Sequence, residues 1–113
     1  MRRDDRQRLD DILIAIEAIR AHLKRGSLGD GLVFDAVRVR LIEIGEAVKA
    51  MSQETLANEP GIPWAEVSGM RDKLAHHYFD TSHAIVSATV EQDLPELEAA
   101  AHRLLDIVRD EEG

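Results

Sequence analysis

Apolar residues recur at steps of three and four along most of this 113-residue chain, and this periodicity is the feature that most constrains its fold. Two stripes lead the pattern, at Leu9, Ile12, Leu13, Ile16, Ile19 and Leu23 and then at Phe34, Val37, Leu41, Ile44, Val48 and Met51. Such spacing places apolar side chains on one face of an α-helix. No segment alternates with a period of two, so the sequence predicts no β-sheet. We expect an all-α, antiparallel bundle of four to five helices in a single domain over residues 1–113.

Turn residues and helix-capping residues divide the chain. Asp4 or Asp5 can cap or charge the start of the first helix, and Gly26 is a plausible stop. A loop (GSLGDG, 26–31) leads into the second helix, a broken segment (52–60) follows it, and the corner Pro60–Pro63 precedes a third helix. That helix has Trp64, Val67, Met70 and Leu74 on its buried side, and two further helix starts are predicted at Asp80–Ser82 and Asp93–Glu96.

Two features of the long helices point to close contacts. Gly45 lies inside the second stripe, where Gly costs up to about 1 kcal/mol relative to Ala, and a close helix–helix approach would explain it. The two heptad-like stripes also present more apolar surface than so small a chain readily covers. We therefore expect a homodimer, in which a two-fold axis brings like elements together.

Composition excludes several classes of site and compartment. The chain has no cysteine, which excludes disulfides, thiolate zinc sites and cysteine nucleophiles. The N-terminal segment MRRDDRQRLDD has no apolar run, so we expect no signal peptide, and charges interrupt every apolar stretch, so we expect no membrane span. These features favour a cytoplasmic protein.

The formal net charge of −8 is concentrated at one end of the chain. Residues 91–113 carry eight acidic and two basic side chains, so the remainder is close to neutral. Overall charge therefore does not favour nucleic acid, and any contact with RNA must be local. Candidate basic contributors are Arg38 and Arg40 in the second helix and Arg2, Arg3, Arg6 and Arg8 at the N-terminus.

The segment from Arg71 to Tyr78 departs from the pattern of a bundle helix, because an Arg, two adjacent His and a Tyr gather in it. Arg71 offers a fixed cation for a phosphate, and a neutral His76 can take the proton from a ribose 2′-OH that attacks the adjacent phosphorus. A second His, supplied by a two-fold axis, can protonate the leaving 5′-oxygen. These groups are the minimum set for metal-free cleavage of RNA.

The spacing of the two groups sets a condition on this chemistry. Arg71 and His76 are five residues apart and lie on different faces of an ideal helix, whereas Arg71 and Tyr78 share one face. Arg71 and His76 therefore converge only if the helix ends between them, or if they meet across a dimer axis.

Other interpretations of the same residues stay open. Histidines at a helix C-terminus can simply suit the helix dipole, Arg71 and Lys73 can belong to a solvated face, and Trp64 suits the core. His22, His83 and His102 stand alone and suit the surface or a helix end. A metal-dependent nucleotide hydrolase is a further alternative, with possible ligands at His76, His77 and His83 and at Asp72 or Asp80, although adjacent histidines rarely bind one ion.

The string GMRDKLAHHYF, from Gly69 to Phe79, fits the Arg-x4-His-x-Tyr signature of the HepT-like toxins of the HEPN superfamily, which the chain therefore resembles. Many members carry Asn after the Arg, where this chain has Asp72, which can pair with Arg71 or orient it. The likeness continues in order along the chain, at DDILIAI (10–16), IEIGEA (42–47), IPW (62–64) and DLPEL (93–97).

The resemblance implies a helical domain that dimerises, with the signature residues of both chains lining a shared cleft. It implies a metal-independent endoribonuclease that needs no cofactor, with Arg71 and His76 as the catalytic pair and Asp72 and His77 as candidate supporting residues. It also implies the toxin of a toxin–antitoxin system, neutralised when a small nucleotidyltransferase antitoxin transfers AMP from ATP to Tyr78. A non-catalytic helical binding partner of that nucleotidyltransferase is the alternative.

Overall fold

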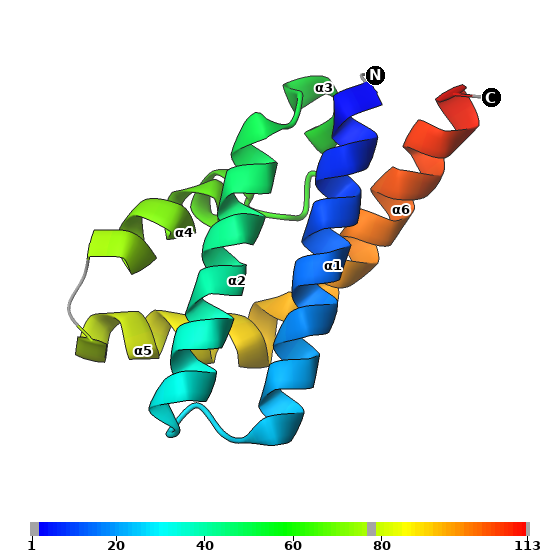
Figure 1. Ribbon diagram of the computed structural model, residues 1–113. Coiled ribbons are helices and arrows are strands. Elements are labelled where there is room, and N and C mark those ends of the chain that lie inside the picture. Colours follow the sequence, from blue (N-terminus) through cyan, green and yellow to red (C-terminus); the bar gives the residue numbers. More distant parts are fainter. Residues whose placement is uncertain (1–2, 77–78, 113) are drawn as a thin grey trace.

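The computed structural model describes residues 3–76 and 79–112, with side chains for 4–75 and 82–112. The described part is helical and has no strand, as the periodicity predicts, and five of its helices have ten residues or more. Helices α1 (Arg3–Arg25) and α2 (Gly31–Ala50) form one layer. The other layer lies behind them in Figure 1 and contains α4 (Trp64–His76), α5 (Phe79–Ala88) and α6 (Leu94–Glu112). None of the described helices is long and apolar enough to cross a membrane.

The two predicted apolar stripes form the centre of the core. Leu9, Ile12, Ile16 and Ile19 on α1 are fully buried, and Leu13 and Leu23 pack against them. All six members of the second stripe are buried on α2 or at its C-cap, Met51. The first helix ends at Arg25, directly before Gly26, and the side chain of Asp30 caps the start of α2 by accepting from the backbone N–H groups of Leu32 and Val33. The predicted stripes and the stop are therefore confirmed.

Gly45 is the point of closest approach between α2 and α4. A Cβ atom placed on Gly45 would lie 3.0 Å from the carbonyl oxygen of Val67 and 3.2 Å from the amide nitrogen of Arg71. Both neighbours are backbone atoms of α4, which cannot move aside as the tip of a side chain can. The predicted close helix–helix approach is confirmed, and it brings the backbone of Arg71 directly against α2.

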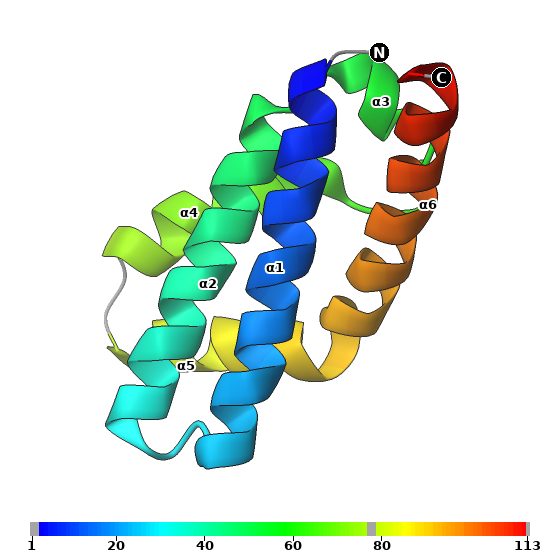
Figure 2. The same cartoon turned by 45° about the vertical axis from the view of Figure 1, so that its right-hand side comes forward.

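The short helix α3 (Gln53–Leu56) is tied to the start of α1 by Asp5, which is 1% exposed. The Asp5 carboxylate accepts from the backbone N–H of Ser52 at 3.1 Å, from the Ser52 hydroxyl at 2.6 Å and from the Thr55 hydroxyl. Asp4 and Asp5 both lie in the first turn of α1, as predicted, and Asp5 also ties this turn to α3. The start of α1, helix α3 and the end of α6 lie together at one end of the molecule (Figure 2).

The corner before α4 is fixed by an indole and an ion pair. The Trp64 indole N–H lies 3.1 Å from the carbonyl oxygen of Leu56 and 3.0 Å from that of Glu59, while its ring packs against the core as predicted. The Glu59 carboxylate in turn accepts two hydrogen bonds from Arg103 of α6, which hold the pKa of Glu59 below its ordinary value. These contacts set the position from which α4 departs.

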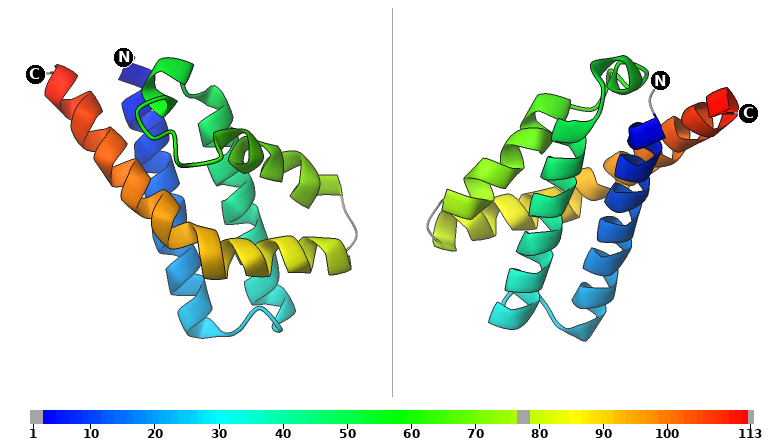
Figure 3. Two further views of the ribbon diagram at one scale, coloured as in Figure 1. Left: turned by 180° about the vertical axis from the view of Figure 1, so that it is seen from behind. Right: turned by 45° about the horizontal axis from the view of Figure 1, so that its top comes forward.

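Of the two helix starts predicted after α4, the second is confirmed, because α6 begins at Leu94 with Pro95 in its first turn, and the first is displaced. Helix α5 begins at Phe79, so Asp80–Ser82 lie within its first turn and do not precede it as an N-cap. It then continues through the π-helical turn η1 (Thr89–Asp93) directly into α6, with no side-chain cap between them. The ring of Pro95 would clash with a carbonyl one turn earlier in a regular α-helix, and the wider π turn accommodates it. The chain bends at this turn, so that α5 crosses behind α1 and α2 at a steep angle (Figure 3).

Replacing Gly45 by Ala tests the close packing of α2 on α4. We expect Gly45→Ala to lower the free energy of unfolding by about 1–2 kcal/mol, because the new methyl group presses on α4 backbone. Gly69→Ala is the matched control, since Gly69 also lies in a helix but has open space where its Cβ would be. The control should gain about 0.5–1 kcal/mol from helix propensity. Urea unfolding followed by circular dichroism measures both, and equal effects would contradict the close approach.

Candidate functional site

Arg71 lies on α4 with its side chain 42% exposed, so a ligand in solvent can reach it. Its Nε donates to Oε1 of Glu46 on α2 at 2.9 Å. A terminal nitrogen of the same guanidinium lies 3.6 Å from a carboxylate oxygen of Asp72, whose side chain is 71% exposed. Asp72 therefore pairs with Arg71, which is one of the two roles that its place beside Arg71 suggested. The contact of Glu46 with Arg71 was not predicted from the sequence, although the adjacent Gly45 indicated close packing along this stretch of α2.

A second side chain of α2 reaches α4 closer to its end. Arg38 is half-buried and donates to the carbonyl oxygen of Leu74 at 3.1 Å. Helix α4 ends at His76, and the Leu74 carbonyl is one of its last four. No backbone N–H of the same helix is placed to donate to these four carbonyls. Basic side chains favour this position because they also suit the negative end of the helix dipole. Arg38, first considered as an RNA contact, thus supports the helix end that carries His76.

Helix α4 continues through His76, so the prediction that a helix end could bring Arg71 and His76 together is wrong. Five residues along one α-helix turn the side-chain direction by about 140°. The positions of Arg71 and His76 therefore lie on different faces of α4. Of the two arrangements that the spacing allowed, a meeting across a dimer axis is the one still open.

Several predicted site residues lie outside the described part of the chain. These are His77 and Tyr78 together with the side chain of His76. Helix α4 ends immediately before this segment and α5 begins immediately after it, so the signature stands at the junction of the two helices. The end of α4 and the start of α5 lie at the edge of the second layer, beyond α2 (Figure 1).

The metal-site alternative finds no support in the described residues. Among them, no group of three or more His, Asp or Glu side chains could hold a metal ion. His83 is a half-buried residue whose ring stacks on Phe34, with centroids 5.2 Å apart, and whose Nε2 lies 3.2 Å from the carbonyl oxygen of Leu28. His83, predicted to stand alone at the surface or a helix end, is instead half-buried and has partners, because α5 packs it against the start of α2.

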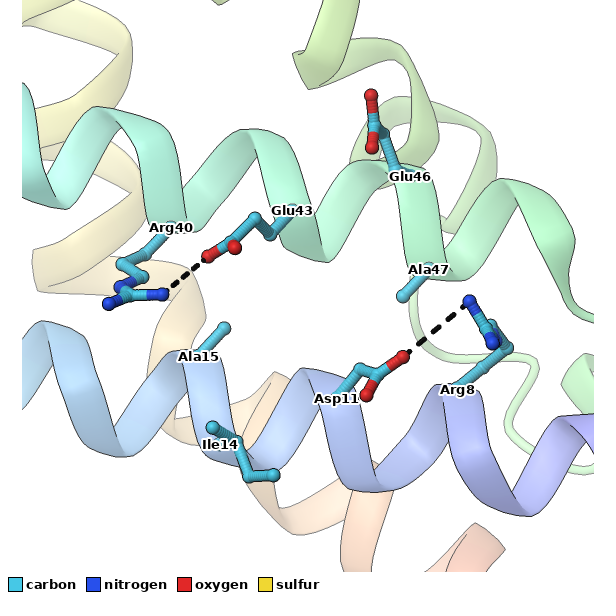
Figure 4. Close-up of a pocket in the computed structure, with 8 residues that line it drawn as sticks. All are labelled: Arg8, Asp11, Ile14, Ala15, Arg40, Glu43, Glu46 and Ala47. Carbon is cyan, nitrogen blue, oxygen red and sulfur yellow. Dashed lines mark hydrogen bonds and ion pairs between the residues drawn. The ribbon is translucent and has the colours of Figure 1, made fainter.

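A groove of about 500 Å³ lies between α1 and α2 on the face away from α4–α6. Figure 4 shows two ion pairs along it, Arg8–Asp11 at 3.5 Å and Arg40–Glu43 at 2.9 Å, with the Glu46 side chain at the rim and turned away from α1. Ile14, which is 62% exposed, also lines this groove. Arg40, a candidate RNA contact, thus lies beside a carboxylate, and Glu46 joins the groove to Arg71.

The arrangement around Arg71 suits recognition of a phosphate. A guanidinium carries five N–H donors, and Glu46 accepts from the one on Nε. The terminal nitrogens remain in a planar fork, of the kind that binds two phosphate oxygens at once. The Asp72 contact at 3.6 Å is an ion pair and is longer than a hydrogen bond.

Comparison with known proteins gives one family and several relatives. The family model described as "Ribonuclease HepT-like" matches residues 11–104, which run from within α1 to within α6. A protein of Thermococcus cleftensis named "Probable ribonuclease HepT" is 34% identical over 108 residues, which cover 92% of this chain and 98% of that protein. No solved structure matches.

Other relatives are similar over a shorter stretch. A protein of Caldanaerobacter subterraneus is 43% identical over 68 residues, covering 59% of this chain and 61% of its own length. A protein of Methanocaldococcus jannaschii is 40% identical over 76 residues, covering 66% of this chain and 60% of its own length. Both carry RNase in their names.

Replacing Arg38 by Met tests its contact with the end of α4, because Met keeps the apolar stem and removes the donor. We expect amide hydrogen exchange over the last turn of α4 to become about five- to tenfold faster, as for the loss of one hydrogen bond worth about 1 kcal/mol. Arg40→Met is the matched control, since Arg40 pairs with Glu43 on its own helix. Unchanged exchange in Arg38→Met would contradict the capping role.

Proposed function

The chain belongs to the HepT-like ribonuclease family, and from this premise we propose that it is a metal-independent endoribonuclease acting in the cytoplasm. The observation that carries the proposal is the position of Arg71 within the matched residues. It is exposed near the end of α4, held from one side by Glu46, and precedes His76 on the same helix. A cation of fixed charge beside a residue that titrates near neutral pH suits cleavage of a phosphodiester.

The proposed reaction uses the substrate's own nucleophile. His76 in its neutral form removes the proton from a ribose 2′-OH, and the 2′-oxygen forms a bond to the adjacent phosphorus. Arg71 stabilises the additional negative charge on the phosphoryl oxygens. The bond from phosphorus to the 5′-oxygen then breaks, and a protonated His76 of a second copy donates a proton to that oxygen. The products are a 2′,3′-cyclic phosphate and a 5′-hydroxyl.

A homodimer is part of the proposal because one chain does not direct both groups to one point. Arg71 and His76 lie five residues apart on one continuous helix, and this spacing turns a position by about 140° around the helix axis. A two-fold axis near the end of α4 would place His76 of one copy opposite Arg71 of the other. It would also supply the second His that the leaving group requires. Asp72 and His77 are candidate supporting residues at the same cleft.

We further propose that the chain is the toxin of a toxin–antitoxin pair. A partner nucleotidyltransferase would transfer AMP from ATP to the phenolic oxygen of Tyr78, with release of pyrophosphate. The adenylate would add bulk and negative charge two residues from His76, where it competes with an RNA phosphate for Arg71.

A non-catalytic binding partner of the nucleotidyltransferase remains a second candidate. The observation that favours it is the pairing of Arg71 with two carboxylates, those of Glu46 and Asp72. A cation paired in this way attracts a phosphate less strongly than a lone one.

Substitution of the catalytic pair tests the ribonuclease. In buffer with EDTA, the wild-type protein should cleave a labelled single-stranded RNA to products with cyclic phosphate ends. Arg71→Ala and His76→Ala should each reduce the rate by about a hundredfold or more, as for loss of an electrostatic or an acid–base group. Arg109→Ala, which removes an exposed Arg of α6, should leave the rate within about twofold. No cleavage by wild type over a range of RNAs would favour the non-catalytic partner.

Mixing subunits tests the shared site in the same assay. After subunit exchange with a tenfold excess of His76→Ala, the rate per wild-type chain should fall to about a tenth, because most wild-type chains then lack a second His76. An equal excess of Arg109→Ala provides the control and should cause no loss. An unchanged rate in the first mixture would contradict a site built from two chains.

Incubation with a partner nucleotidyltransferase and ATP tests the proposed regulation. The intact mass should rise by one or more AMP units, and peptide mapping should place them on Tyr78. Tyr78→Phe should gain no AMP and should keep its ribonuclease activity in the presence of the partner and ATP. Modification at another residue, or unchanged cleavage by the modified protein, would overturn this part of the proposal.

A further inference from the structure

Glu46 stands outside the Arg-x4-His-x-Tyr segment, yet it makes the shortest contact to Arg71 among the described residues. Its Oε1 accepts from the Arg71 Nε at 2.9 Å, whereas Asp72 approaches a terminal nitrogen at 3.6 Å. The contact joins α2 to α4 across 25 residues of sequence. It is therefore a tertiary contact, and its geometry depends on how closely the two helices pack.

The packing of α2 on α4 holds Glu46 in place. Gly45, the preceding residue, lets the amide nitrogen of Arg71 approach α2 so closely that a Cβ would lie 3.2 Å away. Two neighbouring residues of α2 thus contact Arg71: Gly45 packs against its backbone, and Glu46 binds its side chain. Four N–H groups of the guanidinium lie beyond the Nε contact, on its two terminal nitrogens.

We propose that Glu46 is a positioning residue, which anchors the Nε of Arg71 so that the terminal nitrogens face the scissile phosphate of RNA. This inference rests on the proposed ribonuclease function. A long Arg side chain exposed to solvent samples many rotamers, and a single anchored nitrogen removes most of that freedom before substrate arrives. Charge stabilisation is most effective when the donors need no reorganisation during the reaction.

The same carboxylate also carries a cost for substrate binding. Its negative charge lies close to the site where an RNA phosphate must approach, and the two repel each other. Removal of Glu46 should therefore weaken turnover while leaving RNA binding as tight as before or tighter. A lower kcat with an unchanged or lower KM separates a positioning role from a purely structural one, which would lower activity through loss of folded protein. The Glu46 and Arg71 side chains are 56% and 42% exposed, and an ion pair so exposed adds little to stability.

Kinetics of Glu46 variants on a labelled RNA test the proposal. Glu46→Ala should lower kcat by about ten- to a hundredfold with no rise in KM, as for a misplaced catalytic group. Glu46→Gln, whose amide oxygen can still accept from Nε, should recover most of that loss. Glu43→Ala is the matched control, because Glu43 lies on the same helix, lines the same groove and pairs with Arg40. In the Arg71→Ala background, removal of Glu46 should have no further effect on kcat.

Two results would overturn the inference. One is a kcat for Glu46→Ala equal to or above that of wild type, which would mean that Glu46 restrains Arg71 or leaves it unaffected. The other is an equal effect of Glu46→Ala in the presence and absence of Arg71. Urea midpoints near that of wild type establish that each variant is folded.

A spectroscopic measurement separates this inference from the proposed function. The Arg71 Nε–H signal in a ¹H–¹⁵N NMR spectrum should be protected from solvent exchange in wild type and in Glu43→Ala, and should lose that protection in Glu46→Ala. A wild-type protein that cleaves no RNA overturns the ribonuclease and, with it, the catalytic role of Glu46, while the protected signal still establishes the anchoring contact. A wild-type protein that cleaves RNA but shows no such protection overturns the inference alone.

Discussion

The close approach of α4 to Gly45 determines much of the geometry around Arg71. With backbone atoms of Val67 and Arg71 at 3.0 and 3.2 Å from the place of a Cβ, no larger residue fits without moving one helix away from the other. Side chains on either side of this point can then span the two helices. Glu46 does so next to Gly45, and Arg38 does so about two turns earlier. Their hydrogen bonds, at 2.9 and 3.1 Å, have ordinary lengths, which the close packing of the two helices allows.

Helix α2 thus combines two functions along its length. Its buried stripe, which includes Val37, Leu41 and Ile44, packs into the core between the two layers. Its flank carries the polar contacts to α4. The core fixes the position of α2, and Glu46 of α2 binds the guanidinium of Arg71. The position of the guanidinium therefore depends on the packing of the core. A site built on a packed helix is more rigid than one built on a loop.

The sequence was informative about α1 and α2 and much less so about the contacts between elements. Apolar periodicity predicted both long helices and the buried stripes, and the interior position of Gly45 predicted close packing. Periodicity says nothing of which polar side chain meets which, so the contact of Glu46 with Arg71 and the burial of Asp5 under α3 were missed. Asp93–Glu96 correctly marked the start of α6, whereas nothing in the local sequence predicted that α5 reaches it without a break through a π turn. The five-residue spacing of Arg71 and His76 left two arrangements open, and only the length of α4 distinguishes them.

Many arginine side chains of this acidic chain are paired with carboxylates, and this pairing affects how the chain can bind a polyanion such as RNA. Arg6, Arg8, Arg20, Arg40 and Arg103 each have a carboxylate within 4 Å, as does Arg71. Paired guanidinium groups of this kind produce little long-range attraction for RNA, in keeping with the net charge of −8. In the proposed reaction, the substrate is therefore recognised through short-range contacts at a guanidinium with donors to spare. Arg71 meets that condition because Glu46 accepts from its Nε and leaves the terminal nitrogens for the phosphate. In this proposal, RNA is bound through the local contact of its phosphate with Arg71 and not through the overall charge of the chain.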